Sequence, residues 1–277
     1  MGMSMPGRSQ ALSISAWGAV ALLFFCGLLS AFSAGPLAGQ EPLRVAAAAD
    51  LEPVLPPILD RFRAATGIAT EVTYKSSAVL TTQIENGAPF DVFFSADMGF
   101  PKRLIDAGLA DPSGSADSTT PVLYARGTLV LWERRGTPLP APSLDLLRSP
   151  ELKRLAIADP ERAPYGRAAV AALTKLHLYG GLKPRIVTGE NIAQAAQFAY
   201  SGNADAGLIS MTSAVTSRMQ AAGEYFVIPR DLYPRIEQGV VIVSGTKQRA
   251  AAHKLIEYVL SATVQAELAR SGLAPAK

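Results

Sequence analysis

Short apolar runs rich in β-branched and aromatic residues alternate with helix-forming segments along most of this chain. Such runs predict strands at residues 43–49, 70–74, 91–96, 128–132, 154–158, 205–210 and 239–244. Helix-forming segments lie between them, and several end in glycine, which commonly stops a helix, at residues 67, 87, 108 and 180–181. The alternation of strands with helices predicts an α/β protein.

The mature part of the chain divides into two units in this pattern. A proline-rich segment, residues 135–149, enters a second α/β unit that runs to about residue 228, and the chain then returns to the first unit. We therefore expect one lobe from residues 39–126 and 234–277 and a second lobe from residues 127–233. Small ligands often bind at domain junctions, so the pattern predicts a ligand cleft between the lobes.

The N-terminal residues 1–38 differ in composition from the rest. Arg8 is their only formally charged side chain, and an apolar run at 16–29 is followed by small residues at 31–34. The run is shorter than the roughly 20 residues that span a bilayer. This pattern predicts a secretory signal peptide, cleaved between Ser33 and Gly39, and a periplasmic mature protein. The alternatives are a retained membrane anchor and a lipoprotein attached through Cys26, although bulky phenylalanines precede that cysteine.

Composition argues against several classes of function. Cysteine occurs once and the two histidines are far apart, so neither an internal disulfide nor a cysteine-rich metal cluster is expected. The net charge is +3 and no run of five basic residues occurs, so nucleic acid is not an expected partner. The acids at 91–97 lack a third clustered ligand, and we expect no metal cation and no cofactor.

Small and hydroxyl residues stand at several predicted strand-to-helix junctions. They are residues 49–50, 76–77, 164–166, 191–192 and 210–212. A helix N-terminus offers free backbone N–H groups and a dipole that favours negative charge, so such a set can bind an anion without Lys or Arg. Each junction taken singly is explained by ordinary helix capping. The set as a whole indicates an anion site.

Longer motifs extend this pattern over nearly all of residues 43–273. The most specific are the block from Gln83 to Asp97 and the block from Asp159 to Gly166, supported by residues 46–50, 188–198 and 203–210. Together they resemble the periplasmic molybdate-binding proteins of ABC importers. The resemblance implies a two-lobed α/β fold of the type II periplasmic-binding-protein kind. It also implies a monomer that holds molybdate or tungstate by hydrogen bonds and delivers it to an ABC transporter permease.

The resemblance also implies which residues contact the ligand. It places the contacts at Asp50, Ser77, Tyr165, Ile192 and Ser210. Ser77 matches the family's serine, Tyr165 can donate through its hydroxyl, and Ile192 can offer only its backbone N–H. Ser210 stands where several members have tyrosine, so that wall of the site is either shorter or completed by Tyr165.

Asp50 departs from the family, whose best-known members carry a hydroxyl or an amide at this position. A carboxylate about 4 Å from a dianion would repel it by roughly 8 kcal/mol at an effective dielectric constant of about 20. Either the carboxylate caps the first helix while the backbone N–H serves the ligand, or it accepts a hydrogen from a protonated ligand. We favour the cap, because Asp at a strand-to-helix turn is a common local device.

Other functions stay open on the sequence alone. Phosphate or sulfate could be the ligand, because backbone donors select charge and size more than chemical element. An enzyme on the same scaffold is a further alternative, but no Cys or His stands near the serines that could act as nucleophiles, so we expect no enzyme. The sensor half of a cytoplasmic regulator would carry a helix-turn-helix in place of the predicted signal peptide.

Overall fold

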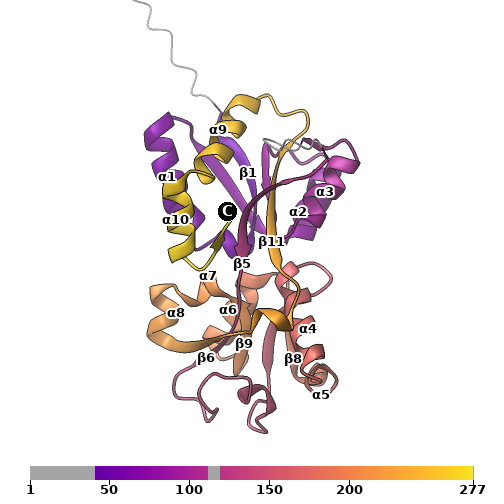
Figure 1. The fold of residues 1–277 in the computed structure, drawn as a ribbon, viewed down its shortest axis with the longest axis vertical. Helices are drawn as coiled ribbons and strands as arrows, with labels where there is room; N and C mark the ends of the chain where they lie inside the picture. The colour runs from indigo at the N-terminus through magenta and orange to yellow at the C-terminus, as the bar shows by residue number, and fades with distance from the viewer. Residues whose placement is uncertain (1–40, 112–118, 277) are drawn as a thin grey trace, which may run out of the picture. The chain divides into compact units, whose positions relative to one another are not determined.

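The computed structural model describes residues 41–111 and 119–276, which form two β-sheets covered by helices (Figure 1). The predicted signal peptide, its cleavage site and Cys26 lie outside the described residues. Within the described part, no helix is both long and apolar enough to cross a membrane.

The first sheet has the strand order β12-β5-β11-β3-β1-β2, with β4 paired to β11. Its strands are β1 (Leu43–Ala48), β2 (Thr70–Lys75), β3 (Val92–Phe94), β4 (Ala110–Asp111), β5 (Val122–Gly127), β11 (Ile236–Val243) and β12 (Ala274–Pro275). Strand β1 pairs in parallel with both β2 and β3, whereas β11 pairs antiparallel with β3, β4 and β5. The carboxyl ends of β1, β2 and β3 therefore meet at one edge of the sheet.

Helices cover this sheet through two apolar clusters. One cluster joins the sheet to α1 (Leu55–Thr66), α9 (Arg249–Val259) and α10 (Ala262–Arg270). The other joins it to α2 (Ser77–Glu85) and α3 (Gly99–Asp106). Figure 1 shows α1 and α10 on one side of the sheet and α2 and α3 on the other. Burial on both sides explains why β1 and β3 are apolar runs without polar alternation.

The second sheet has the order β10-β6-β9-β7-β8. Its strands are β6 (Leu129–Arg134), β7 (Leu155–Ala158), β8 (Ile186–Gly189), β9 (Ala206–Ser210) and β10 (Gly223–Val227). Strand β7 is parallel to β8 and β9. The helices of this part are α4 (Pro164–Lys175), α5 (Tyr179–Leu182), α6 (Ile192–Ser201), α7 (Met211–Ala214) and α8 (Ser217–Ala222). The chain passes between the sheets after β5 and before β11.

Four short 3-10 turns complete the described elements. They are η1 (Ala49–Leu51), η2 (Leu146–Arg148), η3 (Lys183–Arg185) and η4 (Arg230–Leu232). The turn η1 follows β1 directly, and η4 lies in the second crossing between the sheets.

All seven predicted strands are present, so the α/β prediction is confirmed. The helix stops at Gly67, Gly87 and Gly108 are confirmed as well, because each has a positive φ just after its helix. The stop predicted at residues 180–181 is wrong. Helix α4 ends at Lys175, and His177 takes the left-handed conformation with φ 58°.

Candidate functional site

The first sheet brings two of the predicted contacts to one edge. Asp50 follows β1 in η1, and Ser77 is the first residue of α2, directly after β2. In α/β sheets, ligands bind in the crevice outside the carboxyl ends of parallel strands. The adjacent order of β2 and β1 therefore places Asp50 and Ser77 side by side at such an edge.

The second sheet contributes two more contacts by the same rule. Tyr165 lies in the first turn of α4, after β7, and Ile192 begins α6, after β8. Strands β7 and β8 are parallel neighbours, so their carboxyl ends share an edge. Asn191 precedes α6 and its side-chain oxygen accepts from the N–H of Gln194 at 3.0 Å, which fixes where the helix begins.

These four residues meet around one small cavity. The cavity is lined by Ala48, Ala49, Asp50, Ser76, Ser77, Ala96, Ala163, Pro164, Tyr165, Asn191 and Ile192. The two sheets contact each other beside it, because the N–H of Ala78 on α2 donates to the carbonyl of Arg162 ahead of α4 at 3.2 Å. The predicted cleft residues Asp50, Ser77, Tyr165 and Ile192 are thus brought together.

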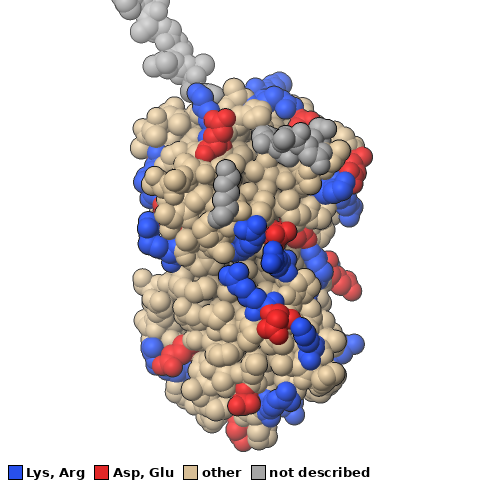
Figure 2. All heavy atoms as spheres, in the orientation of Figure 1, with Lys and Arg blue, Asp and Glu red and all other residues tan. Residues whose placement is uncertain are grey.

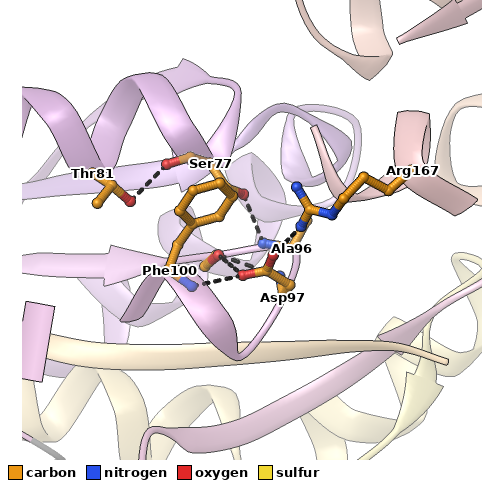
Figure 3. Close-up of polar contacts among 7 residues, drawn as sticks. Ser77, Thr81, Ala96, Asp97, Phe100 and Arg167 are labelled. Carbon is orange, nitrogen blue, oxygen red and sulfur yellow. Dashed lines mark hydrogen bonds and ion pairs between the residues drawn. The ribbon is translucent and has the colours of Figure 1, made fainter. Parts of the chain in front are cut away.

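Ser77 is held in a fixed orientation in the cavity wall. Its Oγ accepts from the N–H of Ala96 at 3.1 Å, and its carbonyl accepts from the Thr81 hydroxyl at 2.8 Å (Figure 3). Because Oγ accepts this bond, its own proton stays free to donate. The backbone N–H of Ser77 stands in the first helical turn and has no partner within α2. Ser77 therefore offers two fixed donors.

Asp50 does not cap the first helix, so that prediction is wrong. No side chain caps η1 or α1, which begins only at Leu55. The Asp50 Oδ2 instead accepts from Gln238 Nε2 at 2.5 Å and from the Tyr165 hydroxyl at 3.1 Å. These two donors come from β11 and α4, so distant segments bind the carboxylate, and the backbone of Asp50 itself adds a smaller contribution.

The environment of Asp50 disfavours its charge. Burial raises the pKa of this carboxyl to about 6, although the hydrogen bonds from Gln238 and Tyr165 lower it in part. Burial also raises the pKa of the Tyr165 hydroxyl well above its usual value, and the nearby Asp50 charge adds to this effect. Tyr165 is therefore a neutral donor.

Glycine allows Tyr165 to reach this position. A Cβ built on Gly127, at the end of β5, would lie 2.8 Å from the Tyr165 Cζ and closer still to its hydroxyl. The first crossing between the sheets thus packs directly against the tyrosine that contacts Asp50. The Tyr165 ring, the Asp50 carboxylate and the chain at Gly127 therefore pack against one another.

Ser210 lies in a different hydrogen-bond network. Its Oγ accepts from the N–H of Ser213 at 3.3 Å and from the Thr212 hydroxyl at 2.9 Å, so it caps α7. It is not among the residues that line the cavity. The contact predicted for Ser210 stays a prediction, and the geometry gives its hydroxyl a capping role.

Two further polar residues at the site were not among the ligand contacts predicted from the sequence. Ser76 lines the cavity beside Ser77, and its buried Oγ has no hydrogen-bond partner in the described structure. Gln238 is fully buried in β11 and donates to Asp50. A single glutamine next to an apolar run gives no sequence signal that it donates to a distant carboxylate. Ser76, in contrast, belongs to one of the predicted strand-to-helix junctions.

Neither a lysine nor an arginine lines the cavity. Figure 2 shows Lys and Arg on the visible surface, most densely at the waist of the molecule, with Asp and Glu among them. Near the cavity, Arg167 of α4 pairs with Asp97, which follows β3 (Figure 3). In the described part of the chain, no group of three His, Cys, Asp or Glu side chains could hold a metal ion. The donors at the cavity are thus neutral hydroxyl and N–H groups, which suit an oxyanion.

Two α/β lobes with polar donors at facing strand ends define a solute-binding protein of the periplasmic type. The family model described as "Bacterial extracellular solute-binding protein" matches residues 43–274, and the chain belongs to this family.

Similar proteins carry more specific names. The "Molybdate-binding protein ModA" of Rhodobacter capsulatus is 36% identical over 242 residues, which cover 87% of this chain and 89% of that protein. The "Molybdate-binding protein ModA" of Azotobacter vinelandii is 34% identical over 235 residues, which cover 84% and 90%. A solved structure of the Azotobacter vinelandii periplasmic molybdate-binding protein matches with a TM-score of 0.77 at 31% identity, covering 84% of this chain and 98% of that chain.

Proposed function

We propose that this protein captures molybdate or tungstate in the periplasm and delivers it to the permease of an ABC importer. The observation that carries this proposal is the convergence of Asp50, Ser77, Tyr165 and Ile192 on one cavity without a cation. The relatives named molybdate-binding support the choice of ligand. The protein acts as a binding protein and not as an enzyme.

The rest of the proposal follows the sequence predictions. The signal peptide is removed between Ser33 and Gly39, and the mature protein works as a monomer without a cofactor. Residues 39–126 with 234–277 form one lobe and residues 127–233 the other, in keeping with the membership of their strands in two sheets. The anion is held between the lobes, at the N-termini of α2, α4 and α6.

Calorimetric titration with molybdate, tungstate, sulfate and phosphate tests the ligand. We expect molybdate and tungstate to bind tightly and sulfate at least about thirtyfold more weakly. Donors positioned for a larger tetrahedral anion are left stretched around a smaller one, and each poorly met buried donor costs about 1 to 3 kcal/mol. Equal affinities for sulfate and molybdate would contradict the proposal, and a preference for phosphate would replace it.

A matched pair of serine variants tests the location of the site. Ser77→Ala removes a hydroxyl that faces the anion, and one hydrogen bond to a charged group is worth about 1.5 to 3 kcal/mol, so affinity should fall about 10- to 150-fold. Ser210→Ala removes the cap of α7, so it should cost about 0.5 to 2 kcal/mol of stability with little change in affinity. Calorimetry and thermal melting of both variants measure this; the opposite pattern would put the ligand at Ser210.

A further inference from the structure

Asp50 has one carboxylate oxygen that is fully bonded and one that is not. Oδ2 accepts two side-chain hydrogen bonds, from Gln238 Nε2 at 2.5 Å and from the Tyr165 hydroxyl at 3.1 Å. Oδ1 is buried and has no partner in the described structure, although Asp50 lines the cavity. A buried polar atom without a partner is rare and calls for an explanation.

The groups that face Asp50 do not neutralise its charge. They are Tyr165 on α4, Tyr124 on β5, Gln238 on β11, Ser76 and Ser77 at the start of α2, and Asn191 and Ile192 at the start of α6. The glutamine, asparagine, serine and isoleucine side chains carry no charge. Both tyrosines are neutral because burial and the Asp50 charge raise their pKa well above the usual value. The neighbouring Arg167 is already paired with Asp97.

The two oxygens differ in a way that matches a neutral carboxylic acid. In the acid, the carbonyl oxygen only accepts hydrogen bonds and the hydroxyl oxygen donates one. Gln238 and Tyr165 both donate to Oδ2, which makes Oδ2 the carbonyl oxygen. A proton would therefore sit on Oδ1, which has no side-chain partner and belongs to a residue that lines the cavity.

We propose that oxyanion binding is coupled to the uptake of one proton by Asp50, whose Oδ1–H then donates to the anion. A buffer acid in solution releases the proton and becomes its conjugate base, and an O–H bond forms at Oδ1. This inference rests on the proposed function, because it takes the ligand to be a fully deprotonated dianion. Gln238 is the positioning residue that directs the proton to Oδ1.

The coupling sets the direction of the pH dependence. The pKa of Asp50 is about 6 before the anion binds, so below that pH the acid is already protonated and affinity is constant. Above it, each molecule must take up a proton to bind, and the dissociation constant rises about tenfold per pH unit. At pH 7, most of a proton should therefore be taken up per anion bound.

Calorimetry with molybdate, in pairs of buffers of different ionisation enthalpy between pH 6 and 8, measures this uptake in the purified protein. In Asp50→Asn the amide donates at every pH, so we expect no proton uptake and a flat pH profile. That variant should bind about a hundredfold more tightly than wild type at pH 8. Thermal melting checks that it folds.

Gln238→Leu provides a second variant with a different signature. Loss of the Gln238 amide removes a hydrogen bond that lowers the pKa of Asp50, so this pKa should rise. The affinity for molybdate should then begin to fall only at a higher pH than in wild type. A residue with a purely structural role would change affinity equally at all pH values.

The outcomes separate the coupling from the proposed function. Tight molybdate binding by wild type without proton uptake, or uptake that persists in Asp50→Asn, overturns the coupling alone. Phosphate preferred over molybdate, with its own proton donated to an ionised Asp50, also overturns it. If neither molybdate nor tungstate binds at any pH, the proposed function fails and the coupling fails with it.

Discussion

Replacing Ile192 with proline should weaken molybdate binding about 10- to 150-fold, because one hydrogen bond to a charged group is worth about 1.5 to 3 kcal/mol. Ile192 is the first residue of α6, where proline is well tolerated and the N–H has no partner within the helix. Asn191 before it is already extended, with φ −150° and ψ 177°, as a residue preceding proline requires. The substitution thus removes the N–H that is proposed to contact the anion, without breaking the helix.

Ile192→Ala is the matched control for this variant. The side chain of Ile192 is buried, so both substitutions lose packing, at a cost of about 2 to 5 kcal/mol for alanine. Alanine keeps the N–H and should bind molybdate nearly as wild type does. Calorimetry and chemical denaturation of the two variants decide the point. Equal affinities would show that the ligand does not use this N–H.

The strands were predictable where they are buried on both faces. Strands β1, β3 and β11 are apolar runs because the two apolar clusters of the first sheet cover them on both faces. The strands β8 and β10 gave no such signal. They lie at the two edges of the second sheet and contain exposed positions, so their few β-branched and aromatic residues do not form a buried apolar run.

The end of α4 shows why a glycine rule can fail. His177 takes the left-handed position, the N–H of Leu178 bonds to the carbonyl of Leu173 at 2.8 Å, and the N–H of His177 bonds to that of Thr174 at 3.0 Å. This is the Schellman pattern, which usually carries glycine at the left-handed position. The bonds and the packing of Leu178 against the core hold a histidine there instead.

The site was predictable in position more than in chemistry. Strand-to-helix junctions identified Asp50, Ser77, Tyr165 and Ile192, because the ends of parallel strands converge whatever their separation in sequence. The partners of Asp50 were not predictable. Gln238 lies 188 residues away and Tyr165 115 residues away, and only the packing of the two sheets shows that they donate to one oxygen.

The substitution Gly166→Ala should damage both stability and binding. Gly166 lies in the first turn of α4, and a Cβ there would lie 2.8 Å from the carbonyl carbons of Ala158 and Asp159 and closer still to the Ala158 oxygen. These atoms are backbone at the end of β7, so no flexible side chain can give way. Overpacking of this kind typically costs about 1 to 3 kcal/mol, or roughly 2 to 4 °C in Tm per kcal/mol for a domain of this size.

Binding should fall with stability because the clash acts next to Tyr165. The first turn of α4 must move away from β7, which stretches the 3.1 Å hydrogen bond from Tyr165 to Asp50 and shifts the facing wall of the cavity. We expect at least a tenfold loss of molybdate affinity, the equivalent of about one charged hydrogen bond.

Gly180→Ala is the matched control, since no atom lies within 4 Å of its Cβ position and its φ is not positive. That control should melt at or slightly above the wild-type temperature and bind normally, because alanine reduces the freedom of the unfolded chain. Normal affinity in Gly166→Ala would mean that the cavity tolerates displacement of the first turn of α4.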